Sequence, residues 1–555
     1  MIRNVFSKII GVILIMGIIA GAVVLVIHGF GNDTSAVSNS MEEGNESNDK
    51  LPNNESVNED IGKILTNTVK KELSETSLKL ELDLDNDDNI DYVLIFDNGS
   101  GDNIEPTVSS EKCIEHKYMN EYEYEIDLSS DYGKVLLTFH EVFDSGMIYY
   151  VEYIPNGSSS KALSFSVKAG KADSYNIFEG YYEDKTLKFN DKDIISSTIL
   201  PNIINFIDGE NNHIKLGRVF HEKKLERSVK TVCEIEQNIN MVIDNETTYR
   251  YEIPVKKGYS TKVEGVLSLK NLIIDKKVKF NIDTLIALDL ANIKYVWADG
   301  VYYDNPSTYR PSAENDFFRA PCATHMRACY WVLDQGSIFT TYGISLMYSY
   351  TKLYNDKNYI PTEPRSNWIY EEYGINENFY DTRFNTDTVS SFLHMQEVYP
   401  DEKIKRVLDN YFKFYIDFVE DNSFYVDGNI FVADYMDYNG NVKMPHCSLN
   451  HMLSEMTVLY RYHLLYGDKE MFELAEKFLH SILNTKDGWI KNNGDLYYCI
   501  TEEGKYKRDD YPLVTYNDLK RAEYYLKKIY GETPQEYQDI LDSKEKWAKE
   551  KGYLK

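Results

Sequence analysis

The segment 83–91 places oxygen-bearing side chains at every second position, directly before an apolar run. In a tight loop, alternate side chains can turn toward one point, and oxygen ligands are those that a hard cation such as Ca²⁺ prefers. The glycine and the terminal glutamate of an EF-hand are missing. Two interpretations stay open: a solvated acidic turn without an ion, or a structural calcium site. Its ligands would be Asp83, Asp85, Asp87, Asn89 and Asp91.

A second run of chemical interest is basic. Lys505, Lys507 and Arg508 fall within four residues of a chain whose formal net charge is −29 and whose pI is about 4.9. So acidic a protein disfavours nucleic acid and anionic membrane surfaces as general partners. An anionic ligand would need a local basic patch, and this run offers one; the alternative is an ordinary solvated loop.

The elements before residue 300 are expected to be strands. Short β-branched and aromatic runs alternate with turn clusters, as at 92–96, 134–139, 147–153, 229–235 and 262–269. Strands at this spacing indicate sandwiches or barrels. We predict two β-rich modules, the first at 62–205 with the possible calcium loop and the second at 206–300.

After residue 315 the apolar residues recur at helical spacing. One face would hold Ile404, Val407, Leu408, Tyr411, Tyr415 and Phe418, and another Leu449, Met452, Leu453, Met456, Leu459 and Tyr460. Gly467 and Asp468 mark a turn between two helices. The predicted fold class is therefore multidomain: β-sandwich or barrel modules followed by an all-α incomplete (α/α) toroid at 315–555.

The N-terminus predicts a membrane anchor. Residues 9–27 are uncharged and almost wholly apolar, long enough to cross a bilayer as a helix, with Arg3 and Lys8 before them. The positive-inside rule places the N-terminus in the cytoplasm and the rest outside the cell. We expect residues 1–30 to form this single-pass anchor, in preference to a cleaved signal peptide, and residues 31–61 a disordered acidic tether.

Four stretches of the helical region, in order, carry motifs with a family likeness. They are Gly343–Leu346 with Tyr350, Asp356 and Lys357; Ala433–Tyr438 with Ser448–Asn450; Gly494–Tyr497; and Arg508–Tyr511 with Thr515, Asn517 and Leu519. Together these resemble the C-terminal domain of D-glucuronyl C5-epimerases, which invert uronic acid residues in heparan-type polysaccharides. The likeness covers about the last 230 residues of the chain.

Two positions depart from the family pattern. Asp437 stands where the family has a glutamate, and Pro512 stands where it has a histidine. A second Glu-Glu-Tyr sequence, Glu371–Tyr373, comes too early in the region to match, and we interpret it as a loop feature.

The resemblance implies an isomerase that removes a proton beside a carboxylate and returns one to the opposite face. The implied acid and base groups are Asp437, Tyr438, Tyr497 and Tyr511. Arg508 would hold the substrate carboxylate, helped by Lys505 and Lys507, while Asn450, Asn517 and Asp510 would also bind substrate. No cofactor is required beyond the possible structural calcium. The expected partners are a uronic acid polysaccharide and the membrane, with a homodimer left open and no nucleic acid.

Other functions stay open. The same carbanion can eliminate its C4 substituent, which would make the protein a uronate lyase. A non-catalytic glycan-binding or envelope protein would explain the departures at Asp437 and Pro512. A glycoside hydrolase would need two facing carboxylates, and Asp434 or Asp437 with Asp510 could form that pair.

Overall fold

A computed structural model describes residues 69–554 except 158–159, 184–185, 227, 233–237, 291–292, 305–306, 313–315 and 439–442. The predicted membrane span and the predicted tether lie outside the described residues. Within the described part, none of the helices combines the length and the apolar character needed to cross a bilayer.

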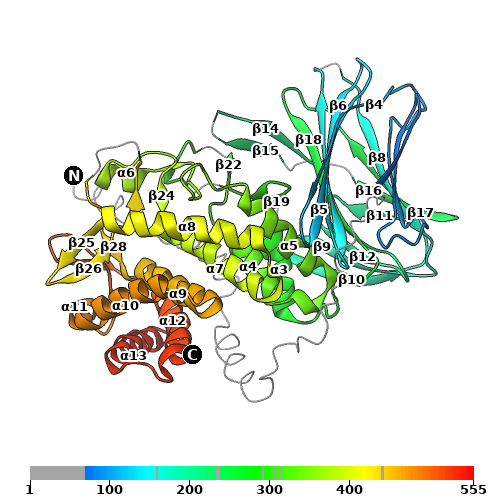
Figure 1. The fold of residues 1–555 in the computed structure, drawn as a ribbon. Coiled ribbons are helices and arrows are strands. Elements are labelled where there is room, and N and C mark those ends of the chain that lie inside the picture. Colours follow the sequence, from blue (N-terminus) through cyan, green and yellow to red (C-terminus); the bar gives the residue numbers. More distant parts are fainter. Residues whose placement is uncertain are drawn as a thin grey trace, which may run out of the picture.

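Two antiparallel sheets form a sandwich in the N-terminal part (Figure 1). The first sheet has the order β1 (Val69–Leu73), β2 (Leu78–Leu82), β3 (Tyr92–Asp97), β8 (Leu163–Gly170), β17 (Glu246–Ile253), β16 (Asn238–Ile243) and β11 (Thr198–Pro201). The second begins β10 (Thr186–Ile194), β9 (Tyr175–Glu183), β12 (Asn205–Asp208), β13 (His213–Leu216) and β18 (Ser260–Ser268). It continues through β14 (Phe220–Lys224), β15 (Val229–Val232), β22 (Asp316–Arg319), β20 (Gly300–Asp304) and β19 (Lys294–Trp297). From β18 it also branches to β7 (Gly146–Pro155), β6 (Gly133–Val142), β5 (Met119–Asp127) and β4 (Thr107–Glu115).

Strand β7 shows why the second sheet is buried on both faces. Its alternate residues Tyr149 and Val151 pack into the core between the sheets, where the Tyr149 ring lies 5.6 Å from that of Phe165 on β8. Ile148 and Tyr150 point the other way, into a core shared with the helices. A strand covered on both faces has a nearly continuous apolar sequence, and β7 has one.

The helical part follows. It contains α3 (Lys279–Leu288), α4 (Thr324–Tyr330), the 3₁₀ turn η1 (Leu333–Gln335), α5 (Ser337–Thr351), α6 (Asn367–Tyr373), α7 (Thr382–Val398) and α8 (Glu402–Asp421). Then come α9 (Leu449–Tyr466), α10 (Lys469–Asn484), α11 (Lys486–Trp489), α12 (Val514–Tyr530) and α13 (Gln535–Glu550). Helix α9 is buried nearly all round because it packs against α7, α10 and α12. The predicted turn is confirmed: Gly467 ends α9 at a φ of 74°, and the Asp468 carboxylate caps α10 by accepting from the Met471 N–H.

The predicted fold class is wrong in two respects. Strands from the two supposed β modules share the same sheets, since β8 pairs with β17 and β18 lies between β7 and β13. The region after residue 315 is also not all-α. It contains the pairs β24 (Tyr380–Asp381) with β27 (Tyr435–Met436) and β25 (Ser423–Val426) with β26 (Asn429–Val432). It also contains β23 (Arg365–Ser366), which pairs with β21 (Tyr309–Arg310) from just before this region. A further sheet is formed by β28 (Cys447–Ser448), β29 (Tyr497–Ile500) and β30 (Tyr506–Asp509).

The physical reason is that local alternation of apolar residues predicts a strand but not its pairing partner. Two-residue strands leave no periodic signal at all, so the small sheets among the helices could not be read from the sequence. The predicted residue boundaries between domains remain predictions.

Polar contacts join the sandwich to the helices. Lys215 on β13 donates to the Tyr342 hydroxyl on α5 at 2.7 Å, and that hydroxyl donates to Glu264 on β18 at 3.0 Å. Lys352, next to α5, donates to the buried Glu121 on β5 at 2.6 Å. Because each pair crosses between the two parts, the sandwich supports the helices directly.

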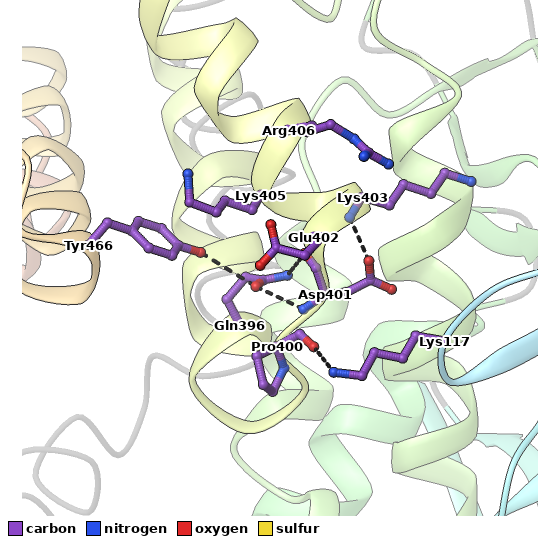
Figure 2. A pocket seen from close by; sticks show the side chains of 9 residues that line it. All are labelled: Lys117, Gln396, Pro400, Asp401, Glu402, Lys403, Lys405, Arg406 and Tyr466. Atoms are coloured by element: carbon purple, nitrogen blue, oxygen red, sulfur yellow. Dashed lines mark hydrogen bonds between the residues drawn. The ribbon is translucent and has the colours of Figure 1, made fainter. Parts of the chain in front are cut away.

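Figure 2 shows a hollow of about 520 Å³ at this junction, near the start of α8. Its polar groups mostly bind one another: the Lys117 ammonium donates to the Pro400 carbonyl at 2.7 Å, and Gln396 bonds both the N–H and the carbonyl of Asp401. The Asp401 carboxylate accepts from the Lys403 N–H at 2.6 Å and caps α8. These contacts hold the junction together, and we assign no ligand to the hollow.

Candidate functional site

The small sheets at the far end of the helices bring separate chain segments together (Figure 1). Helix α6 carries Glu372 and Tyr373 and ends at Gly374, whose φ is 80°. The hairpin β29–β30 presents Arg508 at a φ of 67°, in the left-handed region that costs a non-glycine residue on the order of 1 kcal/mol. Such strain persists only where the surroundings enforce the conformation, and here it directs Arg508 toward α6.

A chain of hydrogen-bonding groups starts at Arg508. The guanidinium donates to Glu372 Oε2, and the Tyr373 hydroxyl lies 2.9 Å from Glu372 Oε1. The same hydroxyl bonds His446 Nδ1, and His446 Nε2 lies 3.2 Å from Asp434 Oδ2. The phenol has a single hydrogen, so it donates either to Glu372 or to His446.

This chain runs from the surface into the interior. The side chains of Arg508 and Glu372 are 34% and 30% exposed, Tyr373 is 5% exposed, and His446 and Asp434 are fully enclosed. Burial raises the pKa of Tyr373, with a further rise from Glu372, so the phenol is neutral in the resting protein. A neutral phenol next to an imidazole is suited to proton transfer.

Asp434 ends the chain as an ionised carboxylate. Burial acts to raise its pKa, but His451, His446 and the Ser448 hydroxyl outweigh burial and lower it. The Ser448 N–H and hydroxyl donate to the two Asp434 oxygens at 2.8 and 2.6 Å. His446 Nε2 makes no hydrogen bond among the described residues, but at 3.2 Å the Asp434 carboxylate is close enough to stabilise the protonated imidazole.

Aromatic rings surround the exposed end. The Arg508 guanidinium lies 4.6 Å from the centre of the Trp368 ring, and that ring lies 5.8 Å from the His446 ring. Tyr511 is 37% exposed and packs edge-on against Tyr498, whose ring is 5.5 Å from His446. Trp368, Arg508 and Tyr511 therefore form the rim of the buried chain, which we call the Arg508 rim.

Two further carboxyl groups, those of Asp381 and Glu455, lie in the buried part of this region. Asp381 pairs opposite Tyr435 between β24 and β27, and the Thr382 N–H donates to the Asp434 carbonyl at 3.0 Å. Burial, with the charge of Asp434, raises the pKa of Asp381 to about 7. Burial likewise raises the pKa of Glu455 on α9 to about 8. Near neutral pH, Glu455 is therefore protonated and Asp434 ionised.

The raised pKa of Glu455 predicts a pH-dependent stability. Its ordinary value is 4.5, so the folded protein holds a proton that the unfolded chain loses as the pH rises from about 4.5. This contribution to stability is full at low pH and is lost as the pH rises through about 8. The free energy of unfolding of Glu455→Gln should therefore exceed that of wild type by about 2–4 kcal/mol at pH 9, and this difference should shrink toward pH 5. Urea unfolding at both pH values measures it.

The matched control is Glu420→Gln on α8. Glu420 is exposed, so its loss should change the free energy of unfolding equally little at both pH values. A Glu455→Gln protein with the same pH profile as wild type would contradict the assignment of a buried, protonated Glu455.

Of the residues predicted from the sequence, Arg508 and Tyr511 meet at this place. Burial and Asp510 raise the pKa of Tyr511, while Arg508 lowers it. Arg508 contacts Trp368 and Tyr511 contacts Tyr498, and the rings of Trp368 and Tyr498 both flank His446. Their predicted roles in the reaction remain predictions.

Other predicted residues have different surroundings. Tyr438 is 53% exposed beneath the Lys357 ammonium, which lies 3.9 Å from the ring centre, and Asp437 accepts from the Asn376 N–H at 3.0 Å. Tyr497 packs on Tyr506 with the Lys491 ammonium 5.1 Å from its ring centre.

The predicted binding residues are also dispersed. Lys505 and Lys507 are exposed on the β29–β30 hairpin, and Asn517 is half-buried on α12. The backbone carbonyl of Asn450 accepts from Arg383 at 3.0 Å. Asp510 is buried and accepts from Thr515 at 2.6 Å and from Lys544 at 2.7 Å. That engagement makes Asp510 a support for the loop that carries Tyr511.

The interpretation of Glu371–Tyr373 as a loop feature is wrong. These residues belong to α6, and Glu372 and Tyr373 link Arg508 to His446. His446 itself was not predicted. It lies 73 residues from Tyr373, in a segment without helical or strand periodicity, so no local signal marked it.

The Asp-rich loop gathers part of the predicted calcium set. Single oxygens of Asp83, Asp85 and Asp91 lie within 4.8 Å of one another. Asp87 and Asn89 bond to each other instead, at 2.8 Å. Burial, together with the neighbouring aspartates, raises the pKa of Asp91 to about 6. Calcium binding at this loop stays a prediction.

Comparisons with known proteins add a partial likeness. No protein-family model matches the chain, and neither does any curated protein. Among solved structures, a family 76 glycoside hydrolase (mannosidase) from Bacteroides thetaiotaomicron shares 11% identity at a TM-score of 0.35, covering 49% of this chain and 70% of that one. Cellobiose 2-epimerase from Bacillus thermoamylovorans shares 11% identity at 0.32, covering 41% and 58%. A sugar epimerase from a ruminal bacterium shares 16% identity at 0.27, covering 35% and 49%.

The chain thus spans about half to three fifths of the length of the two epimerases. The structural neighbours include sugar epimerases and glycoside hydrolases, and TM-scores this low carry no functional argument. The glucuronyl C5-epimerase family itself is not shown by these comparisons.

Proposed function

We propose that the protein modifies an acidic polysaccharide by proton transfer at a uronic acid residue, inverting its C5. One observation supports this most: Arg508 and Tyr511 stand at a partly exposed rim above the Tyr373–His446–Asp434 chain. A cation for the substrate carboxylate, a relayed base and a second phenol are the parts that this reaction requires.

In the proposed reaction, Arg508 turns from Glu372 to the substrate carboxylate and neutralises it, which makes the C5 hydrogen more acidic. His446 takes the phenol proton of Tyr373 at Nδ1, and the resulting phenolate removes the proton from C5. Asp434 stabilises the imidazolium that forms. Tyr511 then donates its proton to the opposite face of C5, which leaves Tyr373 as a phenol, His446 as an imidazolium and Tyr511 as a phenolate. Solvent then takes the extra proton from His446 and returns one to Tyr511, and exchange of the Tyr373 hydroxyl proton with solvent completes the cycle.

A uronate lyase is the nearest rival, since the same carbanion can expel the C4 substituent. It would yield an unsaturated product that absorbs ultraviolet light, whereas inversion leaves the polymer chain intact. Absorbance of the reaction mixture separates the two.

A glycoside hydrolase is a second candidate, favoured by one specific observation. Neighbouring Asp381 and Asp434 have pKa values pushed apart, to about 7 for Asp381 and below the ordinary value for Asp434. Divergent carboxyl groups of this kind can serve as acid and base. Both are buried, however, and Asp381 caps α7 by accepting from the Phe384 N–H. Release of new reducing ends from a polysaccharide would favour this candidate.

The test of the proposed function is deuterium incorporation at C5 of a glucuronate polymer in heavy water. Arg508→Gln should lower kcat/KM for this exchange about tenfold to a hundredfold, because a charged hydrogen bond to the substrate carboxylate is lost. The matched control is Lys413→Gln, an exposed cation on α8, which should retain nearly full exchange. Equal losses in both variants would mean that general charge, and not Arg508, governs the reaction.

A further inference from the structure

A second hollow, of about 410 Å³, lies where the sandwich meets the helical part. It is bounded by the turn between β14 and β15, by the ribbon β21–β23 and by the loop after α6. The residues that line it are Leu225, Glu226, Ser228, Arg310, Pro311, Arg365 and Glu377.

The two arginines of this hollow are held by neutral groups. Arg310 donates to the carbonyls of Ser307 and Tyr309 at 2.6 and 2.7 Å. The Arg365 guanidinium lies 4.4 Å from the centre of the Tyr370 ring. The Asn367 amide oxygen also accepts from Arg310 Nη1 and Nη2 at 3.3 and 3.1 Å, so the N–H groups kept for a ligand are mainly those of Arg365.

Two buried polar atoms of the lining have no hydrogen-bond partner among the described residues: Arg365 Nε and Ser228 Oγ. Ser228 is only 7% exposed. Buried polar groups are nearly always paired, and a group left without a partner at a hollow indicates a ligand or solvent that completes it.

The lining combines donors with acceptors. Glu226 and Glu377 stand beside the two arginines, so a small inorganic anion would meet repulsion as well as attraction. An acidic sugar suits both the arginines and the glutamates, because its carboxylate pairs with a guanidinium while its hydroxyls donate to the glutamates.

The hollow is connected to the Arg508 rim by one helix. Arg365 on β23 immediately precedes α6, and Trp368, Glu372 and Tyr373 lie along α6. Seven residues of helix rise about 10 Å. The hollow and the Arg508 rim are therefore close enough for neighbouring sugar residues of one polysaccharide to occupy both.

We propose that this hollow is a subsite for a second acidic sugar residue of the same polymer, which makes the substrate a polysaccharide and not a free sugar. This rests on the proposed function, because the rim must hold the first uronic acid residue. Arg365 would bind the carboxylate of the second residue, and Ser228 would bind one of its hydroxyls.

Isothermal titration calorimetry tests the subsite without any readout of catalysis. The probes are a polymer of alternating glucuronate and N-acetylglucosamine, and free glucuronate, each at physiological salt. Arg365→Gln should weaken polymer binding about tenfold to a hundredfold, and Ser228→Ala about threefold. Neither should change the affinity for free glucuronate at the rim.

Ser228→Ala is the variant whose folding should not be affected, because removing a hydroxyl that lacks a partner should leave thermal stability equal or higher. A loss of binding in this variant therefore reports on the subsite. The control for general charge is Arg250→Gln on β17, where Arg250 pairs with Asp97 at 2.9 Å. Polymer affinity unchanged by Arg365→Gln and Ser228→Ala would overturn the subsite. So would a wild-type protein that does not bind the polymer, or equal losses in Arg250→Gln.

The two proposals can fail separately. If polymer binding depends on Arg365 but no deuterium enters C5, the subsite stands and the proposed reaction is wrong. If deuterium enters C5 and Arg365→Gln changes neither polymer affinity nor KM, the reaction stands and the subsite is wrong.

Discussion

Tyr373→Phe should lower kcat for C5 exchange by about 10²–10⁴-fold. The hydroxyl lies between Glu372 Oε1, at 2.9 Å, and His446 Nδ1, and it is the group that would touch the C5 proton. Phenylalanine keeps the ring in place but leaves no atom to carry a proton between substrate and imidazole. Steady-state kinetics in heavy water measure the loss, and KM should change little because Arg508 remains to bind the carboxylate.

Tyr425→Phe is the matched control. That residue lies on β25, is largely exposed, and should keep nearly full activity and stability. Comparable losses in the two variants would contradict a specific role for Tyr373, and so would a Tyr373→Phe protein with the wild-type rate.

Lys544→Ala should lower the free energy of unfolding by about 3–5 kcal/mol. The Lys544 ammonium is fully buried and lies 2.7 Å from Asp495 and from Asp510, and it also donates to the Tyr511 carbonyl at 2.8 Å. Its removal leaves Asp510 without this buried cation and leaves Asp495 paired with Lys491, at 3.3 Å. Urea unfolding measures the change.

The pH dependence of this deficit separates the mechanism from simple loss of packing. Burial raises the pKa of Asp510, and lowering the pH protonates this carboxyl group, so the deficit of Lys544→Ala should shrink. Lys546→Ala, an exposed position on the same helix, should change the free energy of unfolding by no more than about 0.5 kcal/mol. A deficit below about 1 kcal/mol at neutral pH, or one independent of pH, would contradict the buried ion-pair account.

Local patterns in the sequence predicted the helices and turns that are determined by residues close together in the chain. Helix α8 buries Ile404, Leu408, Tyr411, Tyr415 and Phe418, as the helical spacing of apolar residues indicated. The turn at Gly467 and Asp468 was predictable as well, because left-handed glycine and an aspartate N-cap each act within a few residues.

Pairing between distant strands could not be predicted in the same way. Strand β8 and strand β17 each alternate apolar and polar residues, but nothing in either segment specifies the other as its partner. The pairing of β8 with β17 thus joins strands from the two supposed modules in one sheet.

The candidate site was predictable only in part, for a related reason. Arg508 and Tyr511 were predicted by resemblance, but Glu372 lies 136 residues from Arg508 and His446 lies 73 residues from Tyr373. Contacts across such separations depend on how α6, β28 and β30 assemble. Tyr373 was also difficult to recognise from the sequence, because a chain with 46 tyrosines contains many similar short motifs.

The central claim is that Arg508 and the Tyr373–His446–Asp434 chain move a proton at C5 of a uronic acid residue. Nuclear magnetic resonance of a glucuronate polymer incubated with the protein in heavy water tests this directly. The account predicts deuterium at C5 with the wild-type protein, greatly reduced incorporation with Tyr373→Phe, and no unsaturated product. Absence of deuterium at C5 after prolonged incubation with a polymer that the protein binds would contradict it.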